Sequence, residues 1–233
     1  MQNIPYRMSA DAIASEQQRF MVRVYNWMAA GLALTGIMAL YVASSETMMN
    51  LVYSNKAVPI ILFVVQIGLV IYLSGWAQKM SASQATGVFL LYAGLTGVTL
   101  SFIFLVYTTA SVAWTFFVTA GTFGSLSLYG YVTKKDLSGM GQFLFMGLIG
   151  LILSRVANMF IESASFDSAL NIIGVLIFAG LTVYDTQKIK QMNILGNEGT
   201  EEDTKEAIVG ALTLYLDFIN LFLHLLRIMG DRR

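Results

Sequence analysis

Seven long apolar runs, separated by short charged islands, set the strongest limit on how this chain folds. A helix rises about 1.5 Å per residue, so about 20 residues cross a hydrocarbon core of about 30 Å. The runs show too little polar–apolar alternation for the strands of an outer-membrane barrel. We therefore predict an all-α membrane protein with seven transmembrane helices, near residues 21–43, 57–76, 85–107, 111–133, 140–162, 168–187 and 207–228.

The composition agrees with a chain that lives in a lipid bilayer. Hydrophobic residues make up 56% of the 233 residues and charged residues only 12%, whereas a soluble domain carries roughly 25% charged residues. The formal net charge is zero, which gives no sign of nucleic-acid binding. The chain has no cysteine, so disulfides and thiolate metal sites are excluded.

Charge also suggests how the chain is organised and oriented. Residues 1–20 are polar and lack the early apolar core of a signal peptide. We expect a cytoplasmic tail at 1–20 and a single seven-helix domain at 21–233. Basic residues mark the cytoplasmic side, and nine fall on the N-terminal side: Arg7, Arg19, Arg23, Lys79, Lys134, Lys135, Lys188, Lys190 and Lys205. Four fall on the other side, Lys56, Arg227, Arg232 and Arg233. The three arginines leave a re-entrant last segment open, although seven crossings are favoured.

One face of the last predicted span carries a stripe of small and polar residues. The stripe consists of Gly210, Thr213, Asp217, Asn220, His224 and Arg227. Steps of three and four residues keep such a set on one helix face. A charged carboxylate within hydrocarbon costs several kcal/mol. We therefore expect Asp217 to face the bundle interior or a water-filled cavity.

The sixth predicted span repeats the arrangement, because Asn171, Gly174, Thr182 and Asp185 share a face. Asp185 lies about 5–8 Å inside the membrane boundary and Asp217 up to about 15 Å inside it. The two carboxylates can therefore meet in the half of the bundle near the N-terminal side. Held close in a low dielectric, they cannot both ionise cheaply and would share a proton. Such a pair suits a proton sensor or cation gate; the alternative is a structural acid near a helix end.

Other polar residues within or between the spans carry weaker expectations. Gln66 in the second span is expected to face the same cavity. Arg155 is expected to snorkel toward the far membrane surface or toward Glu162. His224, the one histidine, suits a structural role, although its place on the stripe keeps a functional role open. The loop acids Glu198, Glu201, Glu202 and Asp203 lack the EF-hand pattern and are expected to be simply solvated.

Four segments carry a family resemblance. TVYDTQKIK (182–190) and LTLYLDFINLFLHLLRIMG (212–230) contain the two aspartates, YGYVTKKDLSGMG (129–141) connects two spans, and VYNWMAAGLALTG (24–36) lies in the first span. Together they resemble the Bax inhibitor-1 family, also called the TMBIM family, and its bacterial inner-membrane branch. The likeness runs from about residue 19 to the C-terminus.

The resemblance implies a seven-helix fold whose last helix is surrounded by the other six. It also implies a pH-sensitive calcium leak controlled by an aspartate pair, which maps to Asp185 and Asp217. In some relatives an arginine at the end of helix 2 latches the pair; here the nearest cation is Lys79. Relatives also pair an acid in helix 2 with an arginine matching Arg227, where this chain has Gln66. Other bacterial relatives are described as modulators of a membrane-anchored ATP-dependent protease.

Two enzyme-like readings of the aspartates and the seven spans fit less well. Intramembrane aspartyl proteases need a GxGD-type sequence at the second acid, which here reads LYLD (214–217), and a proline-containing motif in a further helix. The prolines of this chain are Pro5 and Pro59 only. A retinal pump needs a lysine in the last span, and 207–228 contains none. We therefore expect no enzyme activity.

We predict a pH-sensitive calcium or cation leak in the bacterial inner membrane, gated by Asp185 and Asp217. The expected gating or pore partners are Lys79, Gln66, Asn220, His224 and Arg227. No tightly bound cofactor is expected. Ca²⁺ would be the transported ion, held weakly by the two aspartates because calcium takes 6–8 oxygen ligands. The alternative is a non-transporting regulator of a membrane protease or another membrane protein, acting through the N-terminal tail or the loop 188–206.

Overall fold

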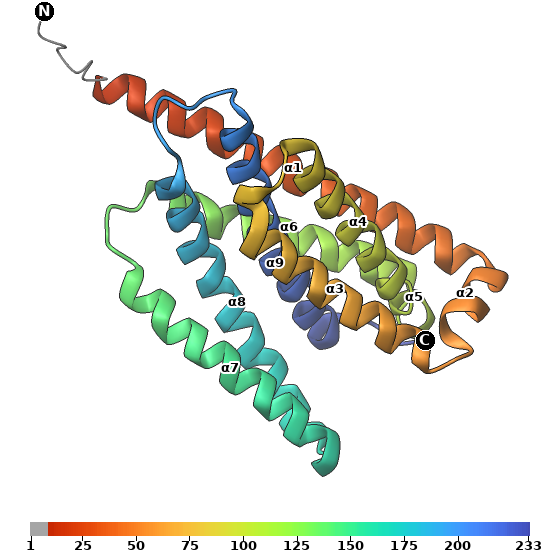
Figure 1. The fold of residues 1–233 in the computed structure, drawn as a ribbon. Helices are drawn as coiled ribbons and strands as arrows, with labels where there is room; N and C mark the ends of the chain where they lie inside the picture. Colours follow the sequence, from red (N-terminus) through yellow and green to blue (C-terminus); the bar gives the residue numbers. More distant parts are fainter. Residues whose placement is uncertain (1–8) are drawn as a thin grey trace, which may run out of the picture.

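The computed structural model describes residues 9–233, which form a bundle of helices (Figure 1). Seven helical segments in this range are long and apolar enough to span a membrane. They are α1 (Ala10–Ser44), α3 (Ala57–Trp76), α4 (Ala82–Leu100) continued by α5 (Ile103–Val106), α6 (Thr109–Val132), α7 (Ser138–Ile161), α8 (Ala164–Met192) and α9 (Glu201–Met229). The short helix α2 (Glu46–Tyr53) lies between the first two spans, and the 3₁₀ helix η1 (Ala77–Lys79) ends the second one. The predicted all-α membrane fold with seven spans is confirmed.

Helix α1 begins earlier than the first predicted span. The side chain of Ser9 accepts a hydrogen bond from the Ala12 amide at 3.2 Å, and Asp11 lies in the first turn. Both features stabilise a helix N-terminus. The helix has 35 residues, about 50 Å, which exceeds a hydrocarbon core of about 30 Å. Part of the predicted tail is therefore helical and extends beyond the core; Arg7 lies outside the described residues.

Helix α9 is the most deeply buried span of the bundle. It packs against α1, α4, α6 and α8, and its Leu214, Tyr215 and Leu221 have no exposed surface. In contrast, α3 packs chiefly on α4, and α7 packs chiefly on α8. Four of the other six spans thus form the close surroundings of α9, and the six-helix surround stays a prediction.

The start of α1 and the C-terminus of the chain lie toward opposite ends of the bundle (Figure 1). After α9, the Thr108 amide donates to the carbonyl oxygen of Asp231 at 3.1 Å. The Arg233 amide donates to the carbonyl oxygen of Val106 at 2.9 Å. The tail is therefore held against the α5–α6 connection, and α9 does not turn back. We call the end of the bundle where α1 begins the N-terminal end, and the end where Arg233 lies the C-terminal end.

The third predicted span is broken near its end. Helix α4 stops at Leu100 and α5 begins at Ile103. The hydroxyl of Tyr53, in α2, lies 2.8 Å from the carbonyl oxygen of Thr99 and 3.1 Å from that of Val98. Carbonyl groups at a helix end need such partners because no further turn supplies an amide. Tyr53 of α2 therefore supplies a hydrogen-bond donor to the free carbonyl groups at the end of α4.

Two glycines set the closest helix crossings. A Cβ atom at Gly130 of α6 would meet the carbonyl oxygen of Val183 in α8. A Cβ atom at Gly97 of α4 would meet the carbonyl oxygen of Thr35 in α1. Backbone atoms cannot move aside as a flexible side chain can, so only glycine permits these approaches. The crossings fix α8 and α1 in their places beside α9.

Candidate functional site

A cavity of about 950 Å³ lies between α7, α8 and α9. It exists because α7 packs chiefly on α8 and leaves one face of α9 uncovered. The cavity extends from Gln142 and Lys188, toward the N-terminal end of the bundle, to Arg155 and Arg227, toward the C-terminal end. Several apolar lining residues are more than half exposed: Phe63, Phe145, Ile152 and Met159. The cavity is therefore open on a surface that faces lipid.

The polar stripe of α9 supplies one wall of this cavity. Five of its six residues line the wall: Thr213, Asp217, Asn220, His224 and Arg227. Gly210 does not, because it packs against α1 and α8. A Cβ atom there would come within 2.9 Å of Ile189 Cγ2 and 3.3 Å of Val24 Cγ2. Within the stripe, Gly210 thus serves helix packing, and the other five residues form the cavity wall.

Asp185 and Asp217 meet in the N-terminal half of the cavity. Both line it, and the two carboxyl groups are near enough for each to influence the other electrostatically. Asp217 is only 5% exposed, and its Oδ2 has no hydrogen-bond partner among the described residues. Asp185 is half-buried. A hydrogen bond between two carboxyl groups requires a proton on one of them, so the arrangement suits a pair that shares a proton.

The cation beside this pair is Lys188 and not Lys79. Lys188 lies one turn beyond Asp185 on α8, lines the same cavity and is near enough to attract the Asp185 carboxylate. Its Nζ lies 5.8 Å from the centroid of the Tyr184 ring. Lys79 is exposed in η1, does not line the cavity and forms no ion pair with a described residue. The structure therefore places Lys79 outside the cavity wall, on η1 beside α9, and its role as a gating partner stays a prediction.

Gln66 also lies away from the cavity, contrary to expectation. Its side chain is buried between α3 and α4 and donates to Thr99 Oγ1 at 2.7 Å. From α3 only Phe63 reaches the cavity wall. The amide therefore satisfies a helix–helix contact, and it does not contact Arg227.

A second polar cluster surrounds Arg155 toward the C-terminal end. Its guanidinium donates to Asp167 and to Asn171 Oδ1, and Nη2 lies 3.5 Å from His224 Nδ1. The Asn171 amide in turn donates to Asp167 at 3.1 Å. Arg155 therefore turns into the bundle, and the expectation that it snorkels outward or toward Glu162 is wrong. The antiparallel helix α8 places the Asp167 carboxylate and the Asn171 side-chain amide beside the guanidinium, and these groups compensate the positive charge of Arg155 inside the bundle.

His224 belongs to the same cluster and is 7% exposed. Its ring stacks on Phe178 with centroids 5.6 Å apart. A Cβ atom at Gly174 would meet this ring, so the glycine makes room for it against α8. These contacts fix the ring, while its edge still lines the cavity.

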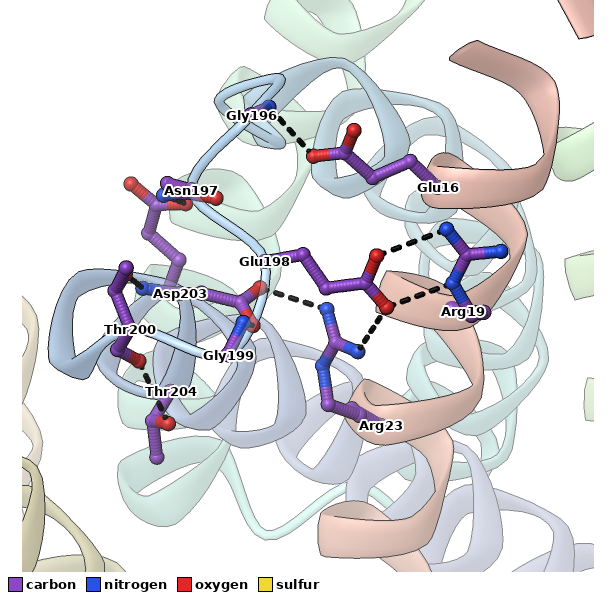
Figure 2. A network of polar contacts seen from close by, with 11 residues as sticks. Glu16, Arg19, Arg23, Gly196, Asn197, Glu198, Gly199, Thr200, Asp203 and Thr204 are labelled. Carbon is purple, nitrogen blue, oxygen red and sulfur yellow. Dashed lines mark hydrogen bonds and ion pairs between the residues drawn. The ribbon is translucent and has the colours of Figure 1, made fainter. Parts of the chain in front are cut away.

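A third polar cluster joins α1 to the loop between α8 and α9, and we call it the α1–loop clamp (Figure 2). Arg19 binds Glu198 through two hydrogen bonds of 2.7 and 2.8 Å. Arg23 contacts Glu198 at 3.3 Å and the buried Asp203 at 2.8 Å. The carboxylate of Glu16 accepts from the Gly196 amide at 2.7 Å. The clamp anchors the loop that connects the two aspartate-bearing helices.

The clamp corrects the expectation of a merely solvated acidic loop. Glu198 and Asp203 are ion-paired, whereas the exposed side chain of Glu201 forms no ion pair or hydrogen bond with a described residue. The hydrogen bond from Arg19 holds the pKa of Glu198 below its ordinary value, and the charges of Arg19 and Arg23 act in the same direction. Electrostatics therefore favour a charged Glu198 and a closed clamp near neutral pH.

Comparison with known proteins places the chain in a family. The sequence model described as "Inhibitor of apoptosis-promoting Bax1" matches residues 17–233. The inner membrane protein YbhL of Escherichia coli (strain K12) is 53% identical, and the match covers 93% of each chain. The chain belongs to the Bax inhibitor-1 family. A protein of Borreliella burgdorferi is 44% identical over 93% of this chain and 94% of its own length. A membrane protein of Streptococcus pyogenes is 35% identical over 91% and 92%.

In this Bax inhibitor-1 family protein, sequence reasoning missed the partner of Arg155 although a signal was present. Helices α7 and α8 are joined by a short connection, so they form an antiparallel hairpin. Arg155 lies seven residues before Glu162, and Asn171 eight residues after Ser163. Positions equally far from a hairpin turn face each other, which pairs Arg155 with the first turns of α8. The pairs of Arg23 had no such signal, because their partners lie 175–180 residues away.

The described residues contain no group of three or more His, Asp or Glu side chains that could hold a metal ion. The aspartate pair contributes two carboxyl groups, and calcium takes 6–8 oxygens in most sites. An ion at the pair would therefore keep most of its water. This geometry suits passage of an ion better than its storage.

Proposed function

We propose that this Bax inhibitor-1 family protein is a pH-controlled cation leak whose gate is the pair Asp185 and Asp217. One observation supports the proposal: the two aspartates are neighbours on the wall of one cavity, which extends toward both ends of the bundle. Acidic side chains at membrane depth are expensive to keep, and they mark ion or proton paths more often than structure. We assign the protein transport and not catalysis, with no tightly bound cofactor.

The gate would work by changing the charge between α8 and α9. With one shared proton, the carboxyl groups hold each other across the two helices. Without it, two adjacent carboxylates repel each other and attract a cation. Lys188 lies one turn away and would compete with that cation for Asp185. The shared proton, the ammonium group of Lys188 and the transported cation would thus compete to neutralise the same pair of carboxylates.

Calcium is the proposed ion, and this choice rests on the family resemblance. Two carboxylates would select a cation over an anion without binding it tightly. Asn220 and Thr213, on the same wall, add uncharged oxygens along the path. The small number of oxygens agrees with a leak that releases its ion.

We place the N-terminal end of the bundle in the cytoplasm and the protein in the bacterial inner membrane. Basic residues gather on the N-terminal side of the spans, nine against four. The Escherichia coli relative carries the name inner membrane protein. The aspartate pair then lies in the cytoplasmic half and would respond to cytoplasmic pH.

Purified protein in vesicles loaded with a calcium dye tests this function directly. We expect calcium entry that changes between about pH 6 and about pH 8. The Asp217→Asn variant should lose the pH dependence, because asparagine resembles a permanently protonated aspartic acid. Glu201→Gln is the matched control, an exposed acid toward the same end of the bundle. Absence of flux from the wild type at every pH would contradict the proposal.

The α1–loop clamp favours a second candidate, a regulator that binds another membrane protein. The N-terminal tail and the loop 188–206 were expected to contact a partner, and the clamp joins the described part of that tail to this loop. Ile194 and Leu195 are 58% and 41% exposed beside it. If Arg19→Gln abolishes a cellular phenotype while flux in vesicles stays at the wild-type value, the regulator fits better than the leak.

A further inference from the structure

Arg227 lacks an acidic partner at the C-terminal end of the cavity. It lines the cavity and is exposed, and no described residue forms an ion pair or hydrogen bond with its side chain. The one carboxylate that attracts it is Asp167, which already binds Arg155 and Asn171. Arg155 and Arg232 lie near enough to repel it. The exposed guanidinium therefore has all of its donors available for a ligand.

The charges around Arg227 favour an anion. Two guanidinium groups, those of Arg155 and Arg232, and one carboxylate, that of Asp167, lie near enough to influence Arg227 electrostatically, and Asp167 is already paired with Arg155. The remaining neighbours on the wall, Asn220 and His224, add polar groups. A guanidinium binds phosphate through two parallel hydrogen bonds, so this surplus of positive charge fits a phosphate group.

An apolar groove continues from this positive end. Ile152, Val156 and Met159 of α7 line the same cavity and are 54%, 49% and 75% exposed, and Phe63 of α3 faces them at 59%. Nothing in residues 9–233 covers these side chains. A positive head beside an open apolar groove complements a molecule with an anionic head and a hydrocarbon chain.

The depth of Arg227 agrees with the headgroup layer of a membrane. Arg227 lies two residues before Met229, where α9 ends, so it is about 3 Å from the helix end. Helix α7 has 24 residues, about 36 Å, slightly more than a hydrocarbon core of about 30 Å. The end of the bundle thus reaches the level at which phosphates of lipids lie.

We propose that the C-terminal end of this cavity binds one anionic phospholipid. Its phosphate would contact Arg227, with Arg155 behind it, and one acyl chain would lie in the groove between α7 and α3. A soluble phosphate would use only the arginines and leave the groove open, whereas a phospholipid uses both. The site shares one cavity with the proposed gate but uses other residues, because the aspartates lie in the other half of that cavity.

Native mass spectrometry of the full-length protein in detergent tests the site by titration with phosphatidylglycerol and, separately, phosphatidylcholine of equal chain length. We expect the first phosphatidylglycerol to bind about tenfold more tightly than phosphatidylcholine. Arg227→Gln should remove about this factor, as loss of a charged hydrogen bond does. Val156→Trp, which fills the groove without changing charge, should also weaken binding severalfold. Lys56→Gln, a basic residue at the same end but outside the cavity, should bind like the wild type.

Each other outcome overturns the assignment. Equal binding by Arg227→Gln and wild type means that the arginine does not hold the lipid. An equal loss in Lys56→Gln means that any basic residue attracts lipid at this end. Full binding by Val156→Trp excludes the groove, and displacement by glycerol phosphate alone shows a site for soluble anions. The thermal unfolding midpoint of each variant is compared with that of the wild type, so that a loss of binding caused by misfolding is recognised.

Discussion

At the scale of single residues, Asp217 is the side chain that most needs a physical reason. It is 5% exposed on a helix that spans the bundle, and one of its oxygens has no partner in the described chain. A structural acid would be expected to accept hydrogen bonds at both oxygens. The nearest acid is Asp185, which adds repulsion when both are charged. Such a residue lowers stability and is kept, we infer, for function.

The stability of Asp217→Asn separates a functional acid from a structural one. We expect the variant to unfold at a higher temperature near neutral pH, by about 1–2 kcal/mol in free energy of unfolding, because one carboxylate of a buried pair is removed. Thermal unfolding in detergent measures this. Glu201→Gln should leave the midpoint unchanged. A clear drop for Asp217→Asn would instead assign the acid to structure.

Glu198 gives a pH dependence whose sign can be worked out. Its pKa in the folded protein lies below the ordinary value of 4.5, chiefly because of the hydrogen bond from Arg19. A lowered pKa stabilises the fold above the ordinary value, and this contribution is lost as the pH falls through the lowered value. We expect wild type to unfold at a higher temperature than Glu198→Gln at about pH 7, and the difference to disappear once the pH has fallen through the lowered pKa of Glu198.

Salt provides the control for this prediction. The Arg19–Glu198 pair is exposed, and at about 1 M salt the screening length falls to about 3 Å. The difference between wild type and Glu198→Gln should therefore shrink at high salt. A difference that persists both in acid and in salt would show that Glu198 acts through packing and not through charge.

At the scale of helices, the close crossings at glycines are the features that could not be predicted from the sequence. Long apolar runs predicted the seven spans, because the thickness of a bilayer fixes their length. The steps of three and four residues predicted which face of α9 lines the cavity. Neither pattern reports which glycine lies at a crossing, since Gly124 and Gly130 belong to the same helix and only Gly130 contacts α8. The register between helices depends on contacts across the whole bundle.

Gly130→Ala and Gly124→Ala form a matched pair on α6. A Cβ atom at Gly130 would overlap the carbonyl oxygen of Val183, whereas at Gly124 nothing lies within 4 Å. We expect Gly130→Ala to lose about 1–3 kcal/mol or to fail to insert stably, because backbone cannot move aside. Gly124→Ala should be neutral or slightly stabilising. Thermal unfolding of the two variants should differ; equal midpoints would contradict the α6–α8 crossing.

At the scale of the whole molecule, three polar clusters lie in order along the bundle. The α1–loop clamp lies at the N-terminal end, where α1 begins (Figure 1), the aspartate pair follows, and the Arg155 cluster lies toward the C-terminal end. The aspartate pair could be predicted from the sequence alone, because Asp185 and Asp217 are acids within long apolar runs. Sequence reasoning predicted the wrong surroundings for Gln66 and Arg155, because these depend on which helices α3 and α7 pack against. Composition within a span does not report its neighbours.

The central claim is that Asp185 and Asp217 act as one unit, and a double-mutant flux experiment tests it most directly. Calcium entry into vesicles would be measured from about pH 6 to about pH 8 for Asp185→Asn, Asp217→Asn and the double variant, with Glu201→Gln as control. We predict that both single variants lose the pH dependence, stay near the value that the wild type reaches in acid, and equal the double variant. Effects that simply add, or pH dependence that survives in either single variant, would contradict a shared proton as the gate.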